Sequence, residues 1–475
     1  MVYAHWIFLL LYVSILVTTV LTVLLDNKQP AKTVTWILVL LFIPLVGFVI
    51  YFFFGQNTRK MKVIGRRSLD LITRHSMLEF ARQRDLRLPD QYKTLINMFA
   101  NSAAAMPFKD NDVDIYTDGH DYFLALLREI GRARRHIHID VYIIEDDPLG
   151  HLIADALIDK AREGVEVRLI YDDVGCWNVP NRFFGRMQRA GIDVRPFMPV
   201  RFPAFTSKVN YRNHRKLCVL DGSVAFIGGM NIALRYVKGT AQDCPWRDTH
   251  LRVRGGAVYA VQCAFLLDWF FVSRMLISDL KYYPDSCRTE GGGCLAQVVT
   301  SSPVAPWPEI MQGYVRIFLE AKKYVYIETP YFLPTEPVVL AMRNAAVAGV
   351  DVRIMIPYRS DSRVMEWAGM PYVVEAVDAG VKVYMYRPGF IHSKILVSDD
   401  YLCTCGSTNI DFRSFENNFE SNLFMYGEDV AMRMKDIFMH DLQQCEPFDR
   451  TAYSAKRPFF RRLIESLVRL VSPLL

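Results

Sequence analysis

Residues 211–221 read YRNHRKLCVLD and are followed by GGMN at residues 228–231. A second stretch reads IHSKILVSD at residues 391–399 and is followed by GSTN at residues 406–409. Both fit one pattern, H-x-K-x4-D-x6-G-[GS]-x-N, where x is any residue. A single copy can arise by chance, but two copies with the same internal spacing indicate a shared function.

The histidine and the lysine of each copy are two residues apart. On a strand such positions share one face, so His214 is predicted to lie beside Lys216 and His392 beside Lys394. A histidine next to a fixed cation, present twice, predicts chemistry on a phosphate group. One imidazole can attack phosphorus and hold the phosphoryl group covalently. The other can protonate the leaving alkoxide and then deprotonate the incoming alcohol, and the motif residues do not distinguish the two roles.

Further residues of the two copies are predicted to complete the site. Amide and hydroxyl donors from Asn231, Ser407 and Asn409 would join the two lysines around the non-bridging phosphate oxygens, where charge builds up in the transition state. No cluster of His, Cys, Asp or Glu near the motifs has metal-ligand spacing, so neither a metal nor another cofactor is expected. Four other histidines are interpreted as surface or core residues: His75, His120, His151 and His440.

Segments around the motifs are also repeated. GVEVRLI at residues 164–170 returns as GVDVRIM at residues 349–355, and AGIDV at residues 190–194 returns as AGVKV at residues 379–383. Short apolar strands alternate with amphipathic helices, which favours a parallel or mixed sheet covered by helices. The period is far too long for a solenoid, whose units have about 20–50 residues. The chain is therefore predicted to contain two homologous α/β halves.

The predicted organisation has five parts. They are a transmembrane hairpin with its basic flank, a connector, the two α/β halves and a C-terminal helix, at residues 1–62, 63–108, 109–290, 295–450 and 451–475. The three glycines at residues 291–293 are the predicted seam between the halves.

Two apolar runs, residues 3–25 and 34–54, predict the N-terminal two-helix transmembrane hairpin, because each has about the 20 residues needed to cross a bilayer. A cleaved signal peptide is a poorer interpretation, because a basic n-region is missing and a second apolar run follows at once. The basic residues that decide orientation are Lys28, Lys32, Arg59, Lys60, Lys62, Arg66 and Arg67. Most of them follow the second run, which places the large C-terminal portion on the cytoplasmic side.

The C-terminal segment is predicted to be a basic amphipathic helix. Positions 460, 463, 464, 467, 468 and 471 share an apolar face, opposite Arg461, Arg462, Glu465 and Arg469. Such a helix can lie on an anionic membrane surface or pack on the second half, and the sequence does not separate the two.

Composition limits the class of protein. At 475 residues, 51% apolar and 22% charged, the chain is a folded protein of more than one domain. Its 56 basic and 50 acidic residues give a net charge of only +6, which is compatible with an anionic partner but does not favour nucleic acid. Nine cysteines without zinc-ligand spacing predict reduced thiols on the cytoplasmic side.

The sequence resembles the bacterial cardiolipin synthases of the phospholipase D superfamily. The resemblance covers nearly the whole chain, from the hairpin to SPLL at residues 472–475. Its supporting segments are NYRNHRK, GGMNI, WRDTH, TPYFLP, NIDFRSF and NFE, at residues 210–216, 228–232, 246–250, 329–334, 409–415 and 418–420. It differs in IALRY at residues 232–236, in TSSP at residues 300–303, and in a Gly-Gly first copy, which leaves Ser407 as the only motif hydroxyl.

The resemblance implies phospholipase D-like halves related by pseudo-twofold symmetry, with both motifs in one site. It implies transfer of a phosphatidyl group from one phosphatidylglycerol to another with release of glycerol, by a multi-pass protein of the bacterial inner membrane. His214 would be the nucleophile and His392 the general acid/base. Asp221 and Asp399 complete the predicted catalytic set in a structural or histidine-orienting role, and Glu420 would support the opposite histidine.

Two other classes remain open. A membrane-bound phospholipase D or nuclease would pass the same intermediate to water, although a nuclease is expected to carry a basic groove for its substrate. A non-catalytic membrane scaffold is disfavoured by two intact motifs. The sequence determines neither the oligomeric state nor whether phosphatidylethanolamine can be a donor.

Overall fold

Two compact units make up the chain, Met1–Lys62 with Val200–Tyr211, and Val63–Pro199 with Arg212–Leu475. The computed structural model describes residues 2–25, 30–43, 46–48, 51, 66–83, 86, 88–200, 210–240, 244–284, 293–455, 457–470 and 472. Both histidine–lysine pairs lie in the larger unit.

The smaller unit contains the helices α1 (Val2–Leu25) and α2 (Pro30–Phe42). Val23, Leu40 and Tyr51 form a small buried apolar cluster. Within the part of the chain that is described, no helix combines the length and the apolarity needed to cross a membrane. The predicted transmembrane hairpin is therefore not confirmed.

Several predictions fall outside the described part of the chain. They concern residues 44–45, 49–50 and 52–54 of the second apolar run, the basic residues Lys28, Arg59, Lys60 and Lys62, the side chains of Lys32, Arg66 and Arg67, the glycines Gly291 and Gly292, position 471 of the predicted apolar helix face, and residues 473–475.

The larger unit is built on a 15-stranded sheet. The strands preceding residue 290 are β1 (Phe108–Tyr116), β2 (His136–Val141), β3 (Glu166–Asp172), β4 (Asp193–Phe197), β5 (Lys216–Leu220), β6 (Val224–Gly228) and β8 (His250–Arg254). The strands following it are β9 (Cys294–Ser301), β10 (Tyr324–Glu328), β12 (Asp351–Pro357), β13 (Lys382–Tyr386), β15 (Ile395–Ser398), β16 (Leu402–Gly406), β18 (Glu420–Tyr426) and β19 (Cys445–Pro447). Two shorter pairs are β7 (Trp246–Arg247) with β14 (Phe390–Ile391), and β11 (Phe332–Leu333) with β17 (Ile410–Asp411).

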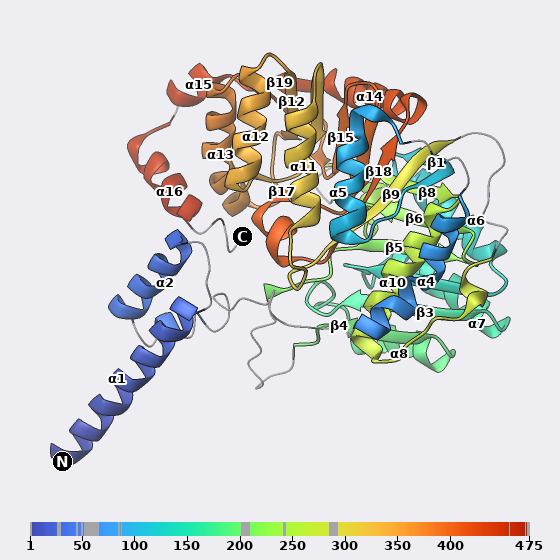
Figure 1. Cartoon of the computed structure of the whole chain (residues 1–475), viewed down its shortest axis with the longest axis horizontal. Coiled ribbons are helices and arrows are strands. Elements are labelled where there is room, and N and C mark those ends of the chain that lie inside the picture. The colour runs from blue at the N-terminus through green and yellow to red at the C-terminus, as the bar shows by residue number, and fades with distance from the viewer. Residues whose placement is uncertain are drawn as a thin grey trace. The chain divides into compact units, whose positions relative to one another are not determined.

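The strand order is the same in both halves when it is followed from the centre of the sheet outward (Figure 1). It runs β1-β8-β6-β5-β2-β3-β4 in one direction and β9-β18-β16-β15-β10-β12-β13 in the other, where β19 adds a last strand. At the centre β1 and β9 pair antiparallel, with Phe108 opposite Ala296. The predicted duplication of an α/β fold is confirmed, and the matching order about an antiparallel pair is that of a pseudo-twofold axis.

The glycines of the repeated segments explain why these segments recur. Gly164 and Gly349 have φ of 88° and 94°, and Gly191 and Gly380 have φ of 92° and 94°. Each follows the end of a helix and precedes a strand. A left-handed residue at that place ends a helix, and glycine adopts it without steric cost. The repeated sequence is therefore a helix-to-strand turn used twice in each half.

Helices cover the sheet. They are α4 (Arg66–Arg82), α5 (Lys93–Ala103), α6 (Gly119–Arg132), α7 (Pro148–Arg162), α8 (Asn181–Arg189), α9 (Arg235–Lys238), α10 (Ala257–Ser273), α11 (Glu309–Glu320), α12 (Glu336–Val347), α13 (Arg363–Asp378), α14 (Glu428–Leu442), α15 (Arg450–Ala455) and α16 (Phe459–Leu470). In the second half α5, α11, α12 and α13 share one apolar core, and α14 packs into another. The helix α5, from the predicted connector, contributes the fully buried Leu95, Ile96 and Phe99 to the first of these cores.

One apolar cluster belongs to both halves. It joins Leu217, Ile227 and Leu251 of the first half to Leu423 and Cys405 of the second, and all five are at most 2% exposed. Fully burying one such aliphatic side chain contributes about 1.5–3 kcal/mol. This shared core holds the two halves together, and with them β5, which begins at Lys216, and β15, which begins directly after Lys394.

Candidate active site

Two short backbone ladders hold the histidines. β7 runs parallel to β14, and the N–H of His392 donates to the carbonyl oxygen of Arg247 at 2.7 Å. In the other ladder the N–H of His214 donates to the carbonyl oxygen of Phe419 at 2.9 Å. Each histidine is therefore held by main chain of the opposite half.

Each histidine also contacts a buried carboxylate of the opposite half. His214 Nδ1 lies 3.0 and 3.1 Å from the two carboxylate oxygens of Glu420. His392 Nδ1 lies 2.6 Å from Asp248 Oδ2. An ionised carboxylate can only accept, so Nδ1 is the donor in both pairs. Nε2 is left as the ring nitrogen with a free lone pair, which suits attack on phosphorus or proton transfer.

The two carboxyl groups are ionised although they are fully buried. Burial alone would raise the pKa of Glu420, but His214 and Lys216 hold it below its usual value. Burial alone would likewise raise the pKa of Asp248, but Lys394 and His392 hold it below its usual value. The site thus contains two fixed negative charges that can stabilise an imidazolium.

Burial keeps both imidazoles neutral in the free protein. It lowers the pKa of His214 to about 4, with Glu420 opposing and both motif lysines adding to the effect. Burial also lowers the pKa of His392 to about 3. The charges of Lys394 and Lys216 lower this pKa further, whereas Asp248 raises it. Since each histidine responds to both lysines, the two motif copies meet in one site.

The lysines are buried cations in the same site. Lys216 Nζ donates to the carbonyl oxygen of His214 at 2.7 Å, and Lys394 donates to that of His392. Burial lowers the pKa of Lys216 to about 7, with Glu420 opposing and Lys394 adding. Burial lowers the pKa of Lys394 to about 8, with Asp248 opposing. Buried cations that are easily deprotonated favour a bound anion, because it compensates charges that water cannot reach.

The Ser407 side chain is hydrogen-bonded to Glu420. Its hydroxyl donates to the Glu420 carboxylate, to which Asn418 Nδ2 also donates at 3.2 Å. These donors orient the carboxylate and keep it ionised. That Ser407 contacts a phosphate stays a prediction.

The two predicted asparagines differ. Asn231 is engaged on both amide atoms, since its Oδ1 accepts from the N–H of Ile143 at 3.1 Å and its Nδ2 donates to the Tyr236 hydroxyl at 3.0 Å. Tyr236 in turn lies 3.5 Å from His392 Nδ1. The Oδ1 atom of Asn409 is buried without a hydrogen-bond partner among the described residues. Asn409 is therefore the one of the two with unused capacity for a bound group.

The motif aspartates do not contact the histidines. Asp221 accepts from the N–H groups of Arg134, Arg135 and His136 at 2.8–3.0 Å. Asp399 does the same for residues 322, 323 and 324 at 2.7–3.0 Å. Each follows the last residue of β5 or β15, five residues after the lysine (221 − 216 and 399 − 394), or about 17 Å along an extended chain. Of the two roles that the resemblance allowed, the contacts are those of the structural one, and the histidine-orienting contacts come from Asp248 and Glu420.

Sequence reasoning missed Asp248 as a site residue. The signal was available, because a duplicated site in which Glu420 supports one histidine requires an acid after the first motif to support the other. The position of this acid differs between the two copies, so the repeat does not predict it. Glu420 follows Asn409 by 11 residues (420 − 409), whereas Asp248 follows Asn231 by 17 (248 − 231).

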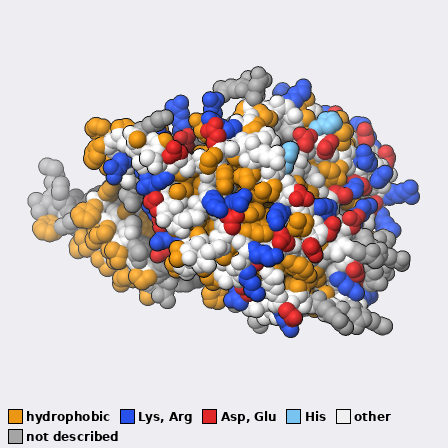
Figure 2. Space-filling model, turned by 90° about the horizontal axis from the view of Figure 1, so that it is seen from above, with side chains coloured by type: hydrophobic (Ala, Val, Ile, Leu, Met, Phe, Trp, Pro, Cys, Tyr) orange, Lys and Arg blue, Asp and Glu red, His pale blue; other side chains and the backbone are white. Residues whose placement is uncertain are grey.

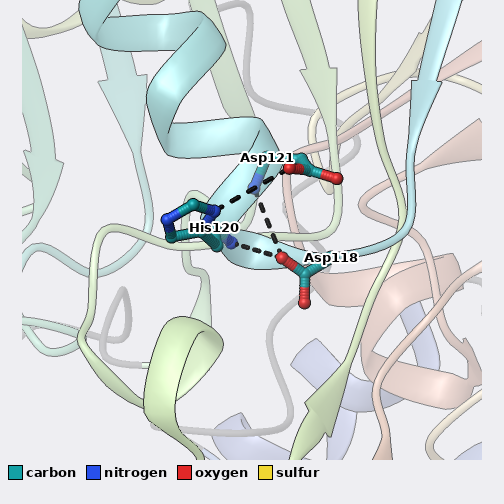
Figure 3. Close-up of side chains that lie close together, drawn as sticks. All are labelled: Asp118, His120 and Asp121. Atoms are coloured by element: carbon teal, nitrogen blue, oxygen red, sulfur yellow. Dashed lines mark hydrogen bonds and ion pairs between the residues drawn. The ribbon is translucent and has the colours of Figure 1, made fainter.

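The described residues contain one group that could hold a metal ion, Asp118, His120 and Asp121 (Figure 3). All three are exposed. Asp118 caps α6 and accepts from the N–H groups of His120 and Asp121 at 2.8 and 3.3 Å. The group serves the start of a helix and shares no residue with the two-histidine site.

The fold resembles a solved structure. The phosphatidylserine synthase of Haemophilus influenzae superposes with a TM-score of 0.62 over 81% of this chain and 100% of that chain, at 13% identity. Residues 126–242 and 314–442 match the family described as "Cardiolipin synthase, PLD-like domain". Residues 6–56 match the family described as "Phospholipase_D-nuclease N-terminal". The duplicated fold and its paired motifs therefore define a member of the phospholipase D superfamily.

Relatives with curated names narrow this class. A cardiolipin synthase of Clostridium perfringens is 39% identical over 95% of this chain and 96% of that protein. One of Alkalihalophilus pseudofirmus is 38% identical over 95% and 90%. The major cardiolipin synthase ClsA of Bacillus subtilis is 36% identical over 98% of both chains. The chain belongs to the cardiolipin synthase family and is an enzyme of the phosphatidyltransferase type, as the sequence predicts.

Proposed function

We propose that this chain makes cardiolipin from two molecules of phosphatidylglycerol through a covalent phosphohistidine intermediate. The observation that carries the proposal is the pair of crossed histidine–carboxylate contacts, His214 with Glu420 and His392 with Asp248. Each leaves one Nε2 free in a site that holds two buried lysines. An anionic phosphorus centre there can be attacked from one side while the group on the other side is protonated.

In the first step Nε2 of His214 attacks the phosphorus of phosphatidylglycerol. A P–N bond forms, the P–O bond to the glycerol head group breaks, and protonated His392 gives its proton to the departing alkoxide. Glycerol leaves, and the phosphatidyl group remains on His214. The assignment of the two histidines follows the family resemblance, because the hydrogen bonding of the site is nearly symmetric.

In the second step neutral His392 takes the proton of a glycerol hydroxyl on a second phosphatidylglycerol. The resulting oxygen attacks phosphorus, the P–N bond breaks, and cardiolipin leaves with His214 restored. His392 ends the cycle carrying the proton that it needs for the next one.

Substrate binding supplies the protonation state that the first step needs. In the free protein burial and the two lysines keep the pKa of His392 near 3. A phosphodiester between Lys216 and Lys394 offsets their charge, which removes part of the repulsion and raises that pKa. The Asp248 carboxylate then stabilises the imidazolium.

The bilayer is the proposed location of the substrate. Support comes from the two apolar runs at residues 3–25 and 34–54 and from the family match over residues 6–56. We place these runs in the bacterial inner membrane as a hairpin, with the catalytic unit on the cytoplasmic face, because basic residues follow the second run.

Incubating the purified protein with phosphatidylglycerol, without divalent metal, tests the reaction. Cardiolipin and free glycerol should appear in equal amounts. Phosphatidic acid as the main product would instead indicate a hydrolase, and no turnover a scaffold. His214→Ala and His392→Ala should each abolish turnover, and a phosphatidyl adduct trapped on His392 would reverse the two roles.

A nuclease is less well supported. Non-specific binding of a nucleic-acid backbone requires a continuous basic surface. On the face shown in Figure 2, Lys and Arg side chains are interspersed with Asp and Glu. Cleavage of single-stranded DNA at a rate comparable to lipid turnover would contradict the lipid assignment.

A further inference from the structure

The C-terminal helix α16 packs with its polar side inward. Glu465 is fully buried and Val468 packs against the core of the second half, whereas five other apolar side chains of the helix face outward. Phe459, Phe460 and Leu467 are 70%, 75% and 55% exposed, and Leu463 and Ile464 are each 44% exposed. An amphipathic helix on a water-soluble surface normally has the opposite orientation. We call these five side chains the outer face of α16.

Ion pairs account for this inverted packing. α16 lies beside α13 (Figure 1), and Arg469 pairs with Glu375 of that helix at 2.9 Å. The Arg469 guanidinium also lies 4.4 Å from the ring centre of Tyr372. Arg461 lies 3.8 Å from Glu366 and 3.0 Å from Glu465.

A second group of contacts locks Glu465 in place. Its carboxylate pairs with Arg457 and accepts from the Tyr453 hydroxyl at 2.9 Å. Partly buried pairs of this kind keep their geometry better than exposed ones, because removing one partner leaves a buried charge. The orientation of α16 is therefore specified by charge, and the outward position of its apolar side chains is a consequence.

Charge and shape beside the outer face fit an anionic lipid. A groove of about 400 Å³ between α13 and α16 is lined by Arg363, Trp367 and Ile464 together with Glu366, Arg461 and Glu465. Arg363 and Arg462 are exposed, and neither has an ion-pair partner among the described residues. An apolar helix face flanked by arginines and an aromatic side chain is typical of helices that lie in the membrane interface.

Arg461 of α16 also lines a second cavity. This cavity, of about 470 Å³, is lined by Arg461 and Tyr453 at one side and by Tyr331 at another. The Tyr331 ring lies 6.4 Å from that of Phe390, which lies 5.8 Å from that of His392. Two ring contacts thus separate this cavity from His392.

We propose that α16 is an interfacial helix whose outer face lies in the phospholipid leaflet, so that lipid reaches the cavity beneath Arg461 directly from the membrane. The partner is the lipid leaflet and not a protein, because arginines flank the apolar face and the cavity lies two ring contacts from a histidine of the phosphodiester site. The sequence left two interpretations of this helix open, and both then apply. The helix packs on the second half through its charges and on the membrane through its apolar side. It adds to the proposed function without depending on which histidine attacks.

Photocrosslinking on the full chain tests this placement. p-Benzoylphenylalanine replaces Leu467, and in a matched control it replaces Val347, an apolar residue on α12 that is 79% exposed. Each protein is reconstituted in vesicles of phosphatidylglycerol and phosphatidylcholine and irradiated. Acyl-chain adducts at position 467 in clear excess over position 347 are expected. Equal adducts, none, or crosslinks between two copies of the chain would overturn the proposal.

A kinetic test separates the helix from the chemistry. Replacing Leu463 and Leu467 with Gln should lower turnover on vesicles roughly tenfold, because interfacial binding scales with buried apolar area. Turnover of a short-chain phosphatidylglycerol dissolved as monomers should not change, whereas His214→Ala should lose both activities. Equal loss on vesicles and monomers, or no loss on either, would contradict a role in the leaflet, while failure of the cardiolipin assay alone would leave the crosslinking result intact.

Discussion

Asp248→Asn isolates the contribution of the carboxylate that the structure adds to the site. The bond from His392 Nδ1 to Asp248 is 2.6 Å long and charge-assisted. Hydrogen bonds to charged groups contribute about 1.5–3 kcal/mol, and 3 kcal/mol corresponds to about a hundredfold in rate. Asparagine keeps the shape but can donate to Nδ1, which would move the imidazole proton to Nε2. We therefore expect kcat to fall at least about tenfold, and up to about ten-thousandfold if the tautomer changes.

The assay is the initial rate of cardiolipin formation from phosphatidylglycerol in mixed micelles, with kcat and KM determined separately. KM should change little, because Lys216 and Lys394 remain to hold the phosphate. The control is Asp112→Asn, which removes an exposed ion pair with Arg254 that contributes at most about 1 kcal/mol. The reasoning is refuted if Asp248→Asn, shown to be folded by its circular dichroism, keeps kcat within about threefold of the unchanged protein.

Three further predictions concern other charged side chains. Asp221→Ala should lower the free energy of unfolding by about 2–4 kcal/mol, because three N–H groups lose their acceptor, whereas Asp221→Asn should retain most of it; equal thermal midpoints for the two variants would contradict the structural role. The value of kcat/KM should fall as the pH rises through about 7–8, because Lys216 and Lys394, whose pKa values burial lowers to about 7 and about 8, lose their charge; a pH profile that stays flat to about pH 10 would be inconsistent with this. Burial raises the pKa of Glu328 from 4.5 to about 8, because the folded state favours the protonated carboxyl group. The contribution of this group to the free energy of unfolding is therefore complete below pH 4.5 and is lost as the pH rises to 8. Glu328→Gln should thus match the unchanged protein near pH 4.5 and exceed its stability at pH 8, by up to about 1.4 kcal/mol per pH unit, and denaturant unfolding at both pH values measures the difference.

Much of the fold could be predicted because its signals are local. The repeated glycine segments mark helix-to-strand turns, and their order alone gives two homologous α/β halves. The H-x-K spacing on a strand likewise predicts which histidine lies beside which lysine. Such patterns depend on backbone geometry over a few residues. The structure has the glycine turns where the sequence places them, but of the two pairs only Lys216 lies on a strand, and His214, His392 and Lys394 lie just before β5 and β15.

The site required contacts between residues far apart in the chain. Asp248 and Glu420 reach the histidines only because β7 pairs with β14 and Phe419 pairs with His214, and neither pairing has a sequence signal. The same holds for Asp221, whose partners are main-chain N–H groups that any residue offers.

The C-terminal helix shows the same division. Its sequence determined an amphipathic helix with one apolar and one charged face, since periodicity is a property of the segment itself. Which face turns inward depends on packing against a neighbouring helix, because the acids that pair with Arg461 and Arg469 belong to α13. In the motif at residues 211–221 the sequence determined the chemical groups, a histidine beside a lysine. The packing of the two halves decided which carboxylate each histidine meets, because a side chain's partner is set by the whole chain's burial and charge.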